Sequence, residues 1–180
     1  MNGHQNVLWI TRTAIFIALL VVLQAATAPL GNSIITGSIV NLLLIISVMT
    51  CGLASGLTVA VVSPVMAKLF GIGPLWALLP FIALGNTALV LVWRFLGGRN
   101  MGNKHAAYAV ALVCGAVVKF LVLYIGIVQI AVPVFLHLPP QQAAVVSSMF
   151  SYPQLLTALI GGIVAMIIIP RLKLATSMKE

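Results

Sequence analysis

The sequence predicts an all-α membrane protein, a bundle of six transmembrane helices with both termini in the cytoplasm. Of its 180 residues, 62% are hydrophobic and only 6% are charged, and the mean hydropathy is +1.23. An ordinary soluble domain has about 25% charged residues, and a chain of this size cannot hide so much apolar surface from water. We therefore expect residues 1–180 to form a single integral-membrane domain that binds a substrate.

The apolar segments predict where the membrane spans lie. A helix needs about 20 apolar residues to cross a bilayer, and glycine and proline mark helix ends. We expect six spans, at roughly Thr13–Ala28, Ser38–Thr50, Leu53–Phe70, Leu75–Leu96, Ala106–Ile130 and Pro153–Ile169. The second and third spans are separated only by Cys51 and Gly52, which predicts a tight hairpin. The second span looks short, so we expect it to be tilted or partly inserted.

The basic residues predict the topology. Cytoplasmic loops of membrane proteins are enriched in Lys and Arg. Most of the nine basic residues lie near the N-terminus, between spans four and five, or in the C-terminal tail: Arg12, Arg94, Arg99, Lys104, Arg171, Lys173 and Lys179. On the opposite side we expect one long loop, Ala131–Tyr152. Long loops often act as lids or binding loops, so binding is expected at the outer face.

The scarcity of acidic residues excludes several functions. The chain has one acidic residue, Glu180. It therefore has no carboxylate pair for acid–base chemistry, no acidic metal cluster and no membrane-embedded acid to relay protons. It also lacks the G-x-x-x-x-G-K-[ST] loop that binds ATP phosphates. We expect no enzyme, no metal site and no energy source within this chain.

Two lysines and several neutral polar residues are candidates for a binding site. Lys119 lies about halfway along span five, where a charge is costly and usually faces a cavity or a partner. It must use carbonyls, water, an exogenous anion or a deprotonated state, because no acidic residue can pair with it. Lys68, near the outer surface, either snorkels to the headgroups or faces a pocket. Trp76 fits an aromatic belt or a stacked ligand.

The neutral polar residues share a bias toward the outer half of the bundle. Each of these side chains alone can form a hydrogen bond between helices, but their shared position favours a pocket. They are Gln24, Asn41, Asn86, Tyr124, Gln129, Gln154 and Thr157. The small residues at four-residue spacing, Ala14 and Ala18 in the first span above all, offer a face where another helix can approach closely.

Three segments carry a resemblance to a known family. They are Thr13–Leu20 with its A-x-x-x-A spacing, Gly37–Leu42 and Pro80–Asn86. With the chain length, the six spans and the basic tail, they make the chain resemble the substrate-binding S components of energy-coupling factor (ECF) transporters. The resemblance extends from Thr11 to Lys173.

The resemblance implies a transport role in a bacterial cell membrane. Ala14 and Ala18 would pack on a membrane T component. Two cytoplasmic ATPases, which use ATP and Mg²⁺, would drive the complex, and this chain would need no cofactor itself. It would bind a vitamin near its outer face under a lid and then topple to release it inside.

Among the vitamins of that family we favour pantothenate. Lys68 and Lys119 suit its carboxylate, and Gln24, Asn86, Tyr124 and Gln154 suit its neutral groups. Hydroxymethylpyrimidine or pyridoxine would instead stack on Trp76 and Tyr124, and cobalamin would need a wider pocket. Outside this family, a stand-alone secondary carrier, a small channel or a structural subunit without a ligand are the alternatives.

Overall fold

The computed structural model describes residues 3–73, 75–99 and 102–177, and every regular element in these ranges is helical. Lys179, Glu180 and the side chain of Lys173 lie outside the described part of the chain. Segments η3 and η4 are π-helical and directly continue α4 and α5. The elements are α1 (Gly3–Thr27), η1 (Ala28–Leu30), α2 (Ser33–Cys51), α3 (Leu53–Leu69), η2 (Trp76–Leu78), α4 (Leu79–Val92), η3 (Trp93–Gly97), α5 (Lys104–Leu123), η4 (Tyr124–Leu136), α6 (Pro140–Met149) and α7 (Tyr152–Ser177).

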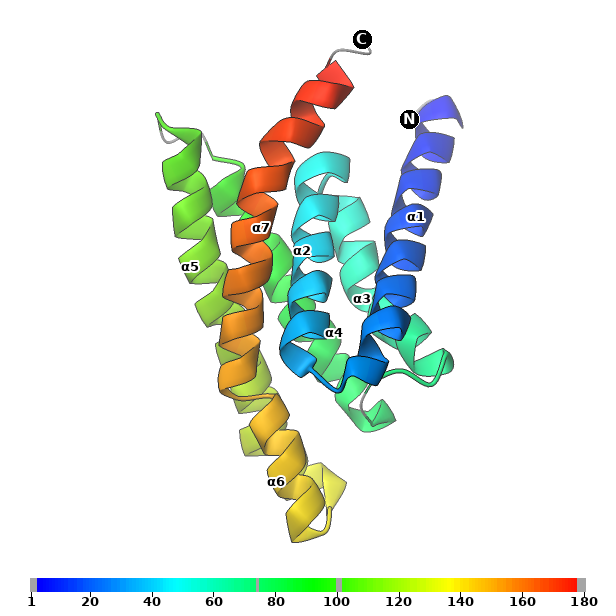
Figure 1. Cartoon of the computed structure of the whole chain (residues 1–180), viewed down its shortest axis with the longest axis vertical. Coiled ribbons are helices and arrows are strands. Elements are labelled where there is room, and N and C mark those ends of the chain that lie inside the picture. Colours follow the sequence, from blue (N-terminus) through cyan, green and yellow to red (C-terminus); the bar gives the residue numbers. More distant parts are fainter. Residues whose placement is uncertain (1–2, 74, 100–101, 178–180) are drawn as a thin grey trace.

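The all-α membrane fold is confirmed. Five helical stretches are long and apolar enough to cross a membrane: Val7–Leu30, Ser33–Cys51, Trp76–Gly97, Lys104–Leu136 and Pro140–Leu172. The third predicted span is a shorter apolar helix, Leu53–Leu69. The count of six spans therefore stays a prediction. In Figure 1 the start of α1 and the end of α7 lie at the same end of the molecule. The side of the membrane that this end faces also stays a prediction.

The predicted hairpin between spans two and three is confirmed, but its first helix is longer than expected. Helix α2 ends at Cys51 and α3 begins at Leu53, and the intervening Gly52 has a φ of 89° that favours glycine. Helix α2 begins at Ser33 because the Asn32 side chain accepts hydrogen bonds from the backbone N–H groups of Ile34 and Ile35. The expectation of a short second span is therefore wrong.

The predicted outer loop Ala131–Tyr152 is also wrong, because most of it is helical. Segment η4 carries the fifth helix on to Leu136 and includes Pro133. Helix α6 starts at Pro140, in the first turn where proline's missing N–H costs nothing. Helix α7 likewise continues past Pro170 to Ser177. Prolines that suggested breaks lie inside these helices or begin them.

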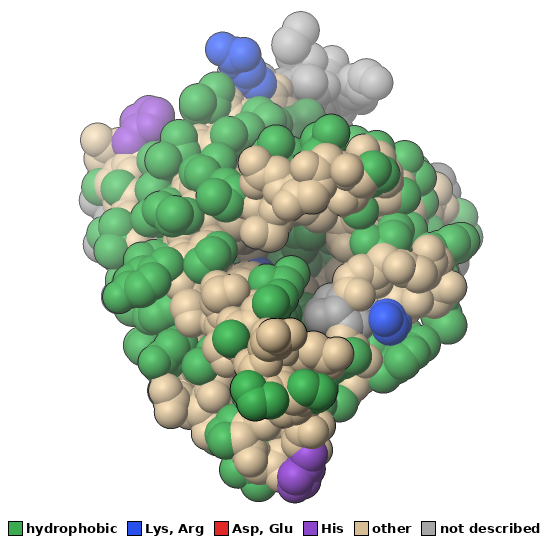
Figure 2. Space-filling model, turned by 60° about the horizontal axis from the view of Figure 1, so that its bottom comes forward, with side chains coloured by type: hydrophobic (Ala, Val, Ile, Leu, Met, Phe, Trp, Pro, Cys, Tyr) green, Lys and Arg blue, Asp and Glu red, His purple; other side chains and the backbone are tan. Residues whose placement is uncertain are grey.

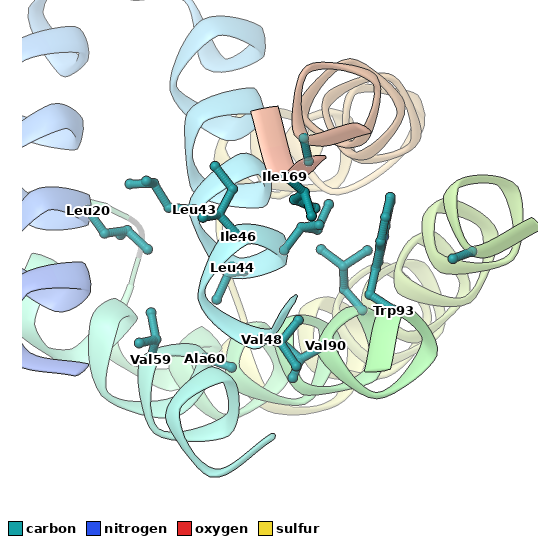
Figure 3. Packing of buried hydrophobic residues seen from close by; sticks show 14 of the residues in the cluster. Leu20, Leu43, Leu44, Ile46, Val48, Val59, Ala60, Val90, Trp93 and Ile169 are labelled. Atoms are coloured by element: carbon teal, nitrogen blue, oxygen red, sulfur yellow. The ribbon is translucent and has the colours of Figure 1, made fainter. Parts of the chain in front are cut away.

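Two buried clusters hold the bundle together. The larger one joins α1, α2, α3, α4, η3, α5 and α7, with Leu20, Leu44, Val59, Trp93 and Ile169 among its members (Figure 3). The smaller one joins η2, α5, η4 and the start of the α6–α7 turn. The space between the two clusters contains the polar residues described next.

Candidate functional site

A cavity of about 340 Å³ opens in the half of the bundle away from the helix ends that carry most of the basic residues. Its walls come from the end of α1, the first half of α2, the end of α3, the first half of α4, the end of α5 and the α6–α7 junction. Figure 2, which brings this end of the molecule forward, shows a hollow near the middle of the face. The lining residues include ten hydrophobic ones and nine that are polar or basic, so the wall combines apolar surface with many polar groups.

Among the described residues that line the cavity, Lys119 is the only ionisable one. Its side chain is 3% exposed. The Nζ atom donates to Asn41 Oδ1 at 2.6 Å and to Asn86 Oδ1 at 2.7 Å. Two amide oxygens, one from α2 and one from α4, thus accept hydrogen bonds from the buried Lys119 amine. Both partners are neutral, and no acidic residue is among the described residues that line the cavity.

A second hydrogen bond fixes the orientation of the Asn41 amide. Its Nδ2 donates to Thr157 Oγ1 at 3.1 Å, and the Thr157 hydroxyl donates to the carbonyl oxygen of Gln154 at 3.1 Å. Since the Thr157 hydrogen is used for Gln154, its oxygen accepts from Asn41. The amide oxygen of Asn41 is therefore directed to Lys119.

Glycines allow α2 and α7 to approach closely enough for this contact. A Cβ atom on Gly161 would lie 2.5 Å from the backbone oxygen of Ser38. A Cβ on Gly37 would lie 2.8 Å from Thr157 Cγ2. Side chains at these two positions would push the helices apart and separate Asn41 from Thr157.

A proline inside α3 fixes the orientation of Asn86. Pro64 has no N–H, so the carbonyl of Ala60 one turn earlier loses its usual partner within the helix. That carbonyl instead accepts a hydrogen bond from Asn86 Nδ2 at 3.4 Å. The Asn86 amide oxygen is thereby directed to Lys119, as the Asn41 oxygen is. Both acceptors are held in place before any ligand arrives.

The structure brings five of the ten candidate binding residues together in one cavity. Lys119, Asn41 and Asn86 form the polar cluster, and Gln24 and Gln154 line the same cavity. Gln154 Nε2 donates to the carbonyl oxygen of Met149 at 3.1 Å, which ties the start of α7 to the end of α6. Contact of these five residues with a ligand stays a prediction.

The other five candidates do not line the cavity: Lys68, Trp76, Tyr124, Gln129 and Thr157. Trp76 is 55% exposed and Lys68 is half-buried on α3. Tyr124 stacks on Phe120, with ring centroids 5.6 Å apart, and its hydroxyl oxygen accepts from Gln129 Nε2. Their position around the helix differs from the one expected, while their depth in the membrane stays a prediction. Tyr124 follows Lys119 by five residues, which rotates it about 140° around the helix axis.

Sequence reasoning did not assign Ser63 and Pro64 to the binding site, although both line the cavity. Ser63 and Pro64 had only the signal of a polar residue and a proline in an apolar helix. Such residues are common in membrane helices.

The predicted docking pair, Ala14 and Ala18, is exposed on α1. Two glycines at such spacing elsewhere, Gly56 and Gly162, are packed tightly instead. A Cβ on Gly56 would lie 2.6 Å from Val48 Cβ, and one on Gly162 would lie 2.4 Å from Leu112 Cδ1. The α1 pair is open to a partner, and the partner itself stays a prediction.

The family model described as "ECF transporter, substrate-specific component" matches residues 9–172. The chain belongs to this family. It is thus a membrane-embedded, substrate-specific transport subunit, as the resemblance implied. No curated protein and no solved structure shows significant similarity to it.

Proposed function

We propose that this chain binds a small organic anion, with pantothenate as the first candidate, and delivers it inward together with a T component and two ATPases. One observation carries the choice of an anion. Lys119 places a buried positive charge at the cavity wall and meets two neutral acceptors but no carboxylate. An ammonium group has three donors. The two amide oxygens leave one donor for a ligand carboxylate.

The cavity's size supports a small ligand. Its volume of about 340 Å³ lies near the lower end of the range of roughly 300–1,000 Å³ for small-molecule pockets. This argues against cobalamin. Pyridoxine and hydroxymethylpyrimidine were expected to stack on Trp76 and Tyr124, and neither residue lines the cavity. Pantothenate has one carboxylate for Lys119, and its hydroxyl and amide groups suit neutral partners such as Gln24 and Gln154.

The arrangement of charges supports a cavity that opens to the outside. Arg99, Lys104 and Arg171 flank helix ends at the end of the molecule where α1 starts and α7 ends (Figure 1). Under the positive-inside rule that end is cytoplasmic. The exposed pair Ala14 and Ala18 lies on α1, on the same side of the cavity as this end, and is available to a T component.

A search for bound small molecules tests this function. The chain is purified in mild detergent, and native mass spectrometry is used to look for a copurified ligand. Calorimetry then follows with pantothenate, pyridoxine, hydroxymethylpyrimidine and cobalamin. We expect binding of pantothenate at 1:1 stoichiometry and none of cobalamin. Binding of pyridoxine or of no vitamin, with pantothenate inactive, would contradict the proposal.

A further inference from the structure

Ser63 has a buried hydroxyl group that the protein leaves without a partner. The residue is 1% exposed, and its Oγ has no hydrogen-bond partner among the described residues. Hydroxyl groups in helices usually bond to the carbonyl one turn earlier. Thr13, Thr50 and Thr58 all do so here, at 2.7–2.9 Å. Buried polar atoms without partners are rare in native proteins and call for an explanation.

The position of Ser63 supplies that explanation. Ser63 lines the cavity, as do Pro64 and, one turn later, Ala67. These three residues are small and lie near the end of α3, so they leave room for a ligand against that wall. Lys119 lines the same cavity from α5. The cavity wall thus contains Lys119 on one helix and, on another, Ser63, whose buried hydroxyl has no partner among the described residues.

We propose that Ser63 Oγ contacts the ligand and forms a second polar binding point in addition to Lys119. This inference rests on the proposed function and narrows its substrate class. The substrate is a carboxylic acid that also carries a hydroxyl, carbonyl or amide group away from the acid. The acid group lies at Lys119, and the neutral group exchanges a hydrogen bond with Ser63. A simple fatty acid would leave the Ser63 hydroxyl without a hydrogen-bond partner.

The chain offers a matched control in Ser38. Its Oγ is also buried and without a partner among the described residues, but Ser38 does not line the cavity. Ser63→Ala and Ser38→Ala therefore remove the same kind of group, and only the first removes it from the cavity. Removing a hydroxyl group that has no hydrogen-bond partner breaks no hydrogen bond, so the ligand-free chain should not lose stability. We expect the melting temperature of the ligand-free protein to be unchanged or raised for both variants.

The test is calorimetry with pantothenate and with panthenol, the neutral alcohol analogue that lacks the carboxylate. Ser63→Ala should weaken the binding of both compounds by about three- to tenfold, as expected for one neutral hydrogen bond. Ser38→Ala should weaken neither. The wild-type chain should bind panthenol more weakly than pantothenate, because the charge contact with Lys119 is lost.

The outcomes separate the two proposals. If wild type prefers pantothenate over panthenol but Ser63→Ala binds both as tightly as wild type does, the Ser63 inference is overturned and the proposed function stands. If wild type binds neither compound, the proposed function is contradicted and the Ser63 inference falls with it. A lower melting temperature of ligand-free Ser63→Ala, together with unchanged affinity, would assign Ser63 to structure alone and overturn the inference.

Discussion

Replacing Asn41 with aspartate should make the protein supply its own anion to Lys119. The substitution keeps the side chain's shape and places a carboxylate oxygen where Asn41 Oδ1 now lies, 2.6 Å from Lys119 Nζ. The buried charge then gains an internal counter-ion. The ligand carboxylate loses the net positive charge that attracts it and meets a like charge as well.

The expected loss of affinity follows from the hydrogen bond involved. A bond to a charged group contributes about 1.5–3 kcal/mol, or roughly ten- to a hundredfold in affinity. Repulsion between two carboxylates adds to this loss. Asn41→Asp should therefore bind pantothenate at least about tenfold more weakly than wild type does. The ligand-free variant should melt no lower than wild type, because the new ion pair offsets the lost bond from Asn41 Nδ2 to Thr157.

Asn86→Asp is the informative comparison. It also places a carboxylate beside Lys119, at 2.7 Å, but its second oxygen would face the Ala60 carbonyl oxygen, to which Nδ2 now donates at 3.4 Å. We expect a similar loss of affinity with a lower melting temperature than Asn41→Asp. Calorimetry and thermal unfolding measure both quantities. Wild-type affinity for pantothenate in both variants would refute the idea that Lys119 binds an anion.

Three further predictions concern the supports of the site and its partner. Pro64→Ala restores a backbone N–H that can donate to the Ala60 carbonyl, so it competes with Asn86 Nδ2 for that acceptor and loosens the contact of Asn86 with Lys119. Calorimetry should show about three- to tenfold weaker binding of pantothenate. Unchanged binding would contradict a role of Pro64 in orienting Asn86. Gly161→Ala places a methyl group against backbone and should lower the free energy of unfolding by about 1–3 kcal/mol; chemical or thermal unfolding that matches wild type would show that the helices are not tightly packed there. Replacing Ala14 or Ala18 with Trp should prevent copurification with a T component while leaving pantothenate affinity intact; normal assembly of both variants would place the interface elsewhere.

The helices could be predicted well because the bilayer imposes one strong requirement, a long apolar run, that hydropathy reports directly. The segment Ala131–Tyr152 was misread for a specific reason. Its prolines at 133, 139 and 140 were taken as breaks, but one lies within a π-helical segment and another starts α6. A proline restricts the backbone, but it is compatible with a break, with a position inside a helix and with the first turn of a helix. Tertiary structure decides among the three.

The candidate site could be predicted only in part. The sequence gives the position of a residue along its helix, but it does not give which neighbour the side chain faces around the helix axis. Lys119, Asn41 and Asn86 were recognised as polar residues deep in apolar helices, and the structure joins them. Tyr124 lies at a similar depth but on another side of its helix. Ser63 could not be recognised, because a helical serine normally bonds to its own backbone, and only the structure shows that this one does not.

Binding of an anion requires the charge of Lys119. Lys68 provides a matched control because it is a lysine that does not line the cavity. The decisive measurement is the calorimetric affinity of pantothenate for Lys119→Met and Lys68→Met. Methionine keeps much of the stem's packing and removes the charge. We predict that Lys119→Met loses roughly ten- to a hundredfold in affinity while Lys68→Met binds as wild type does. Wild-type affinity in Lys119→Met, with only its melting temperature lowered, would contradict the central claim.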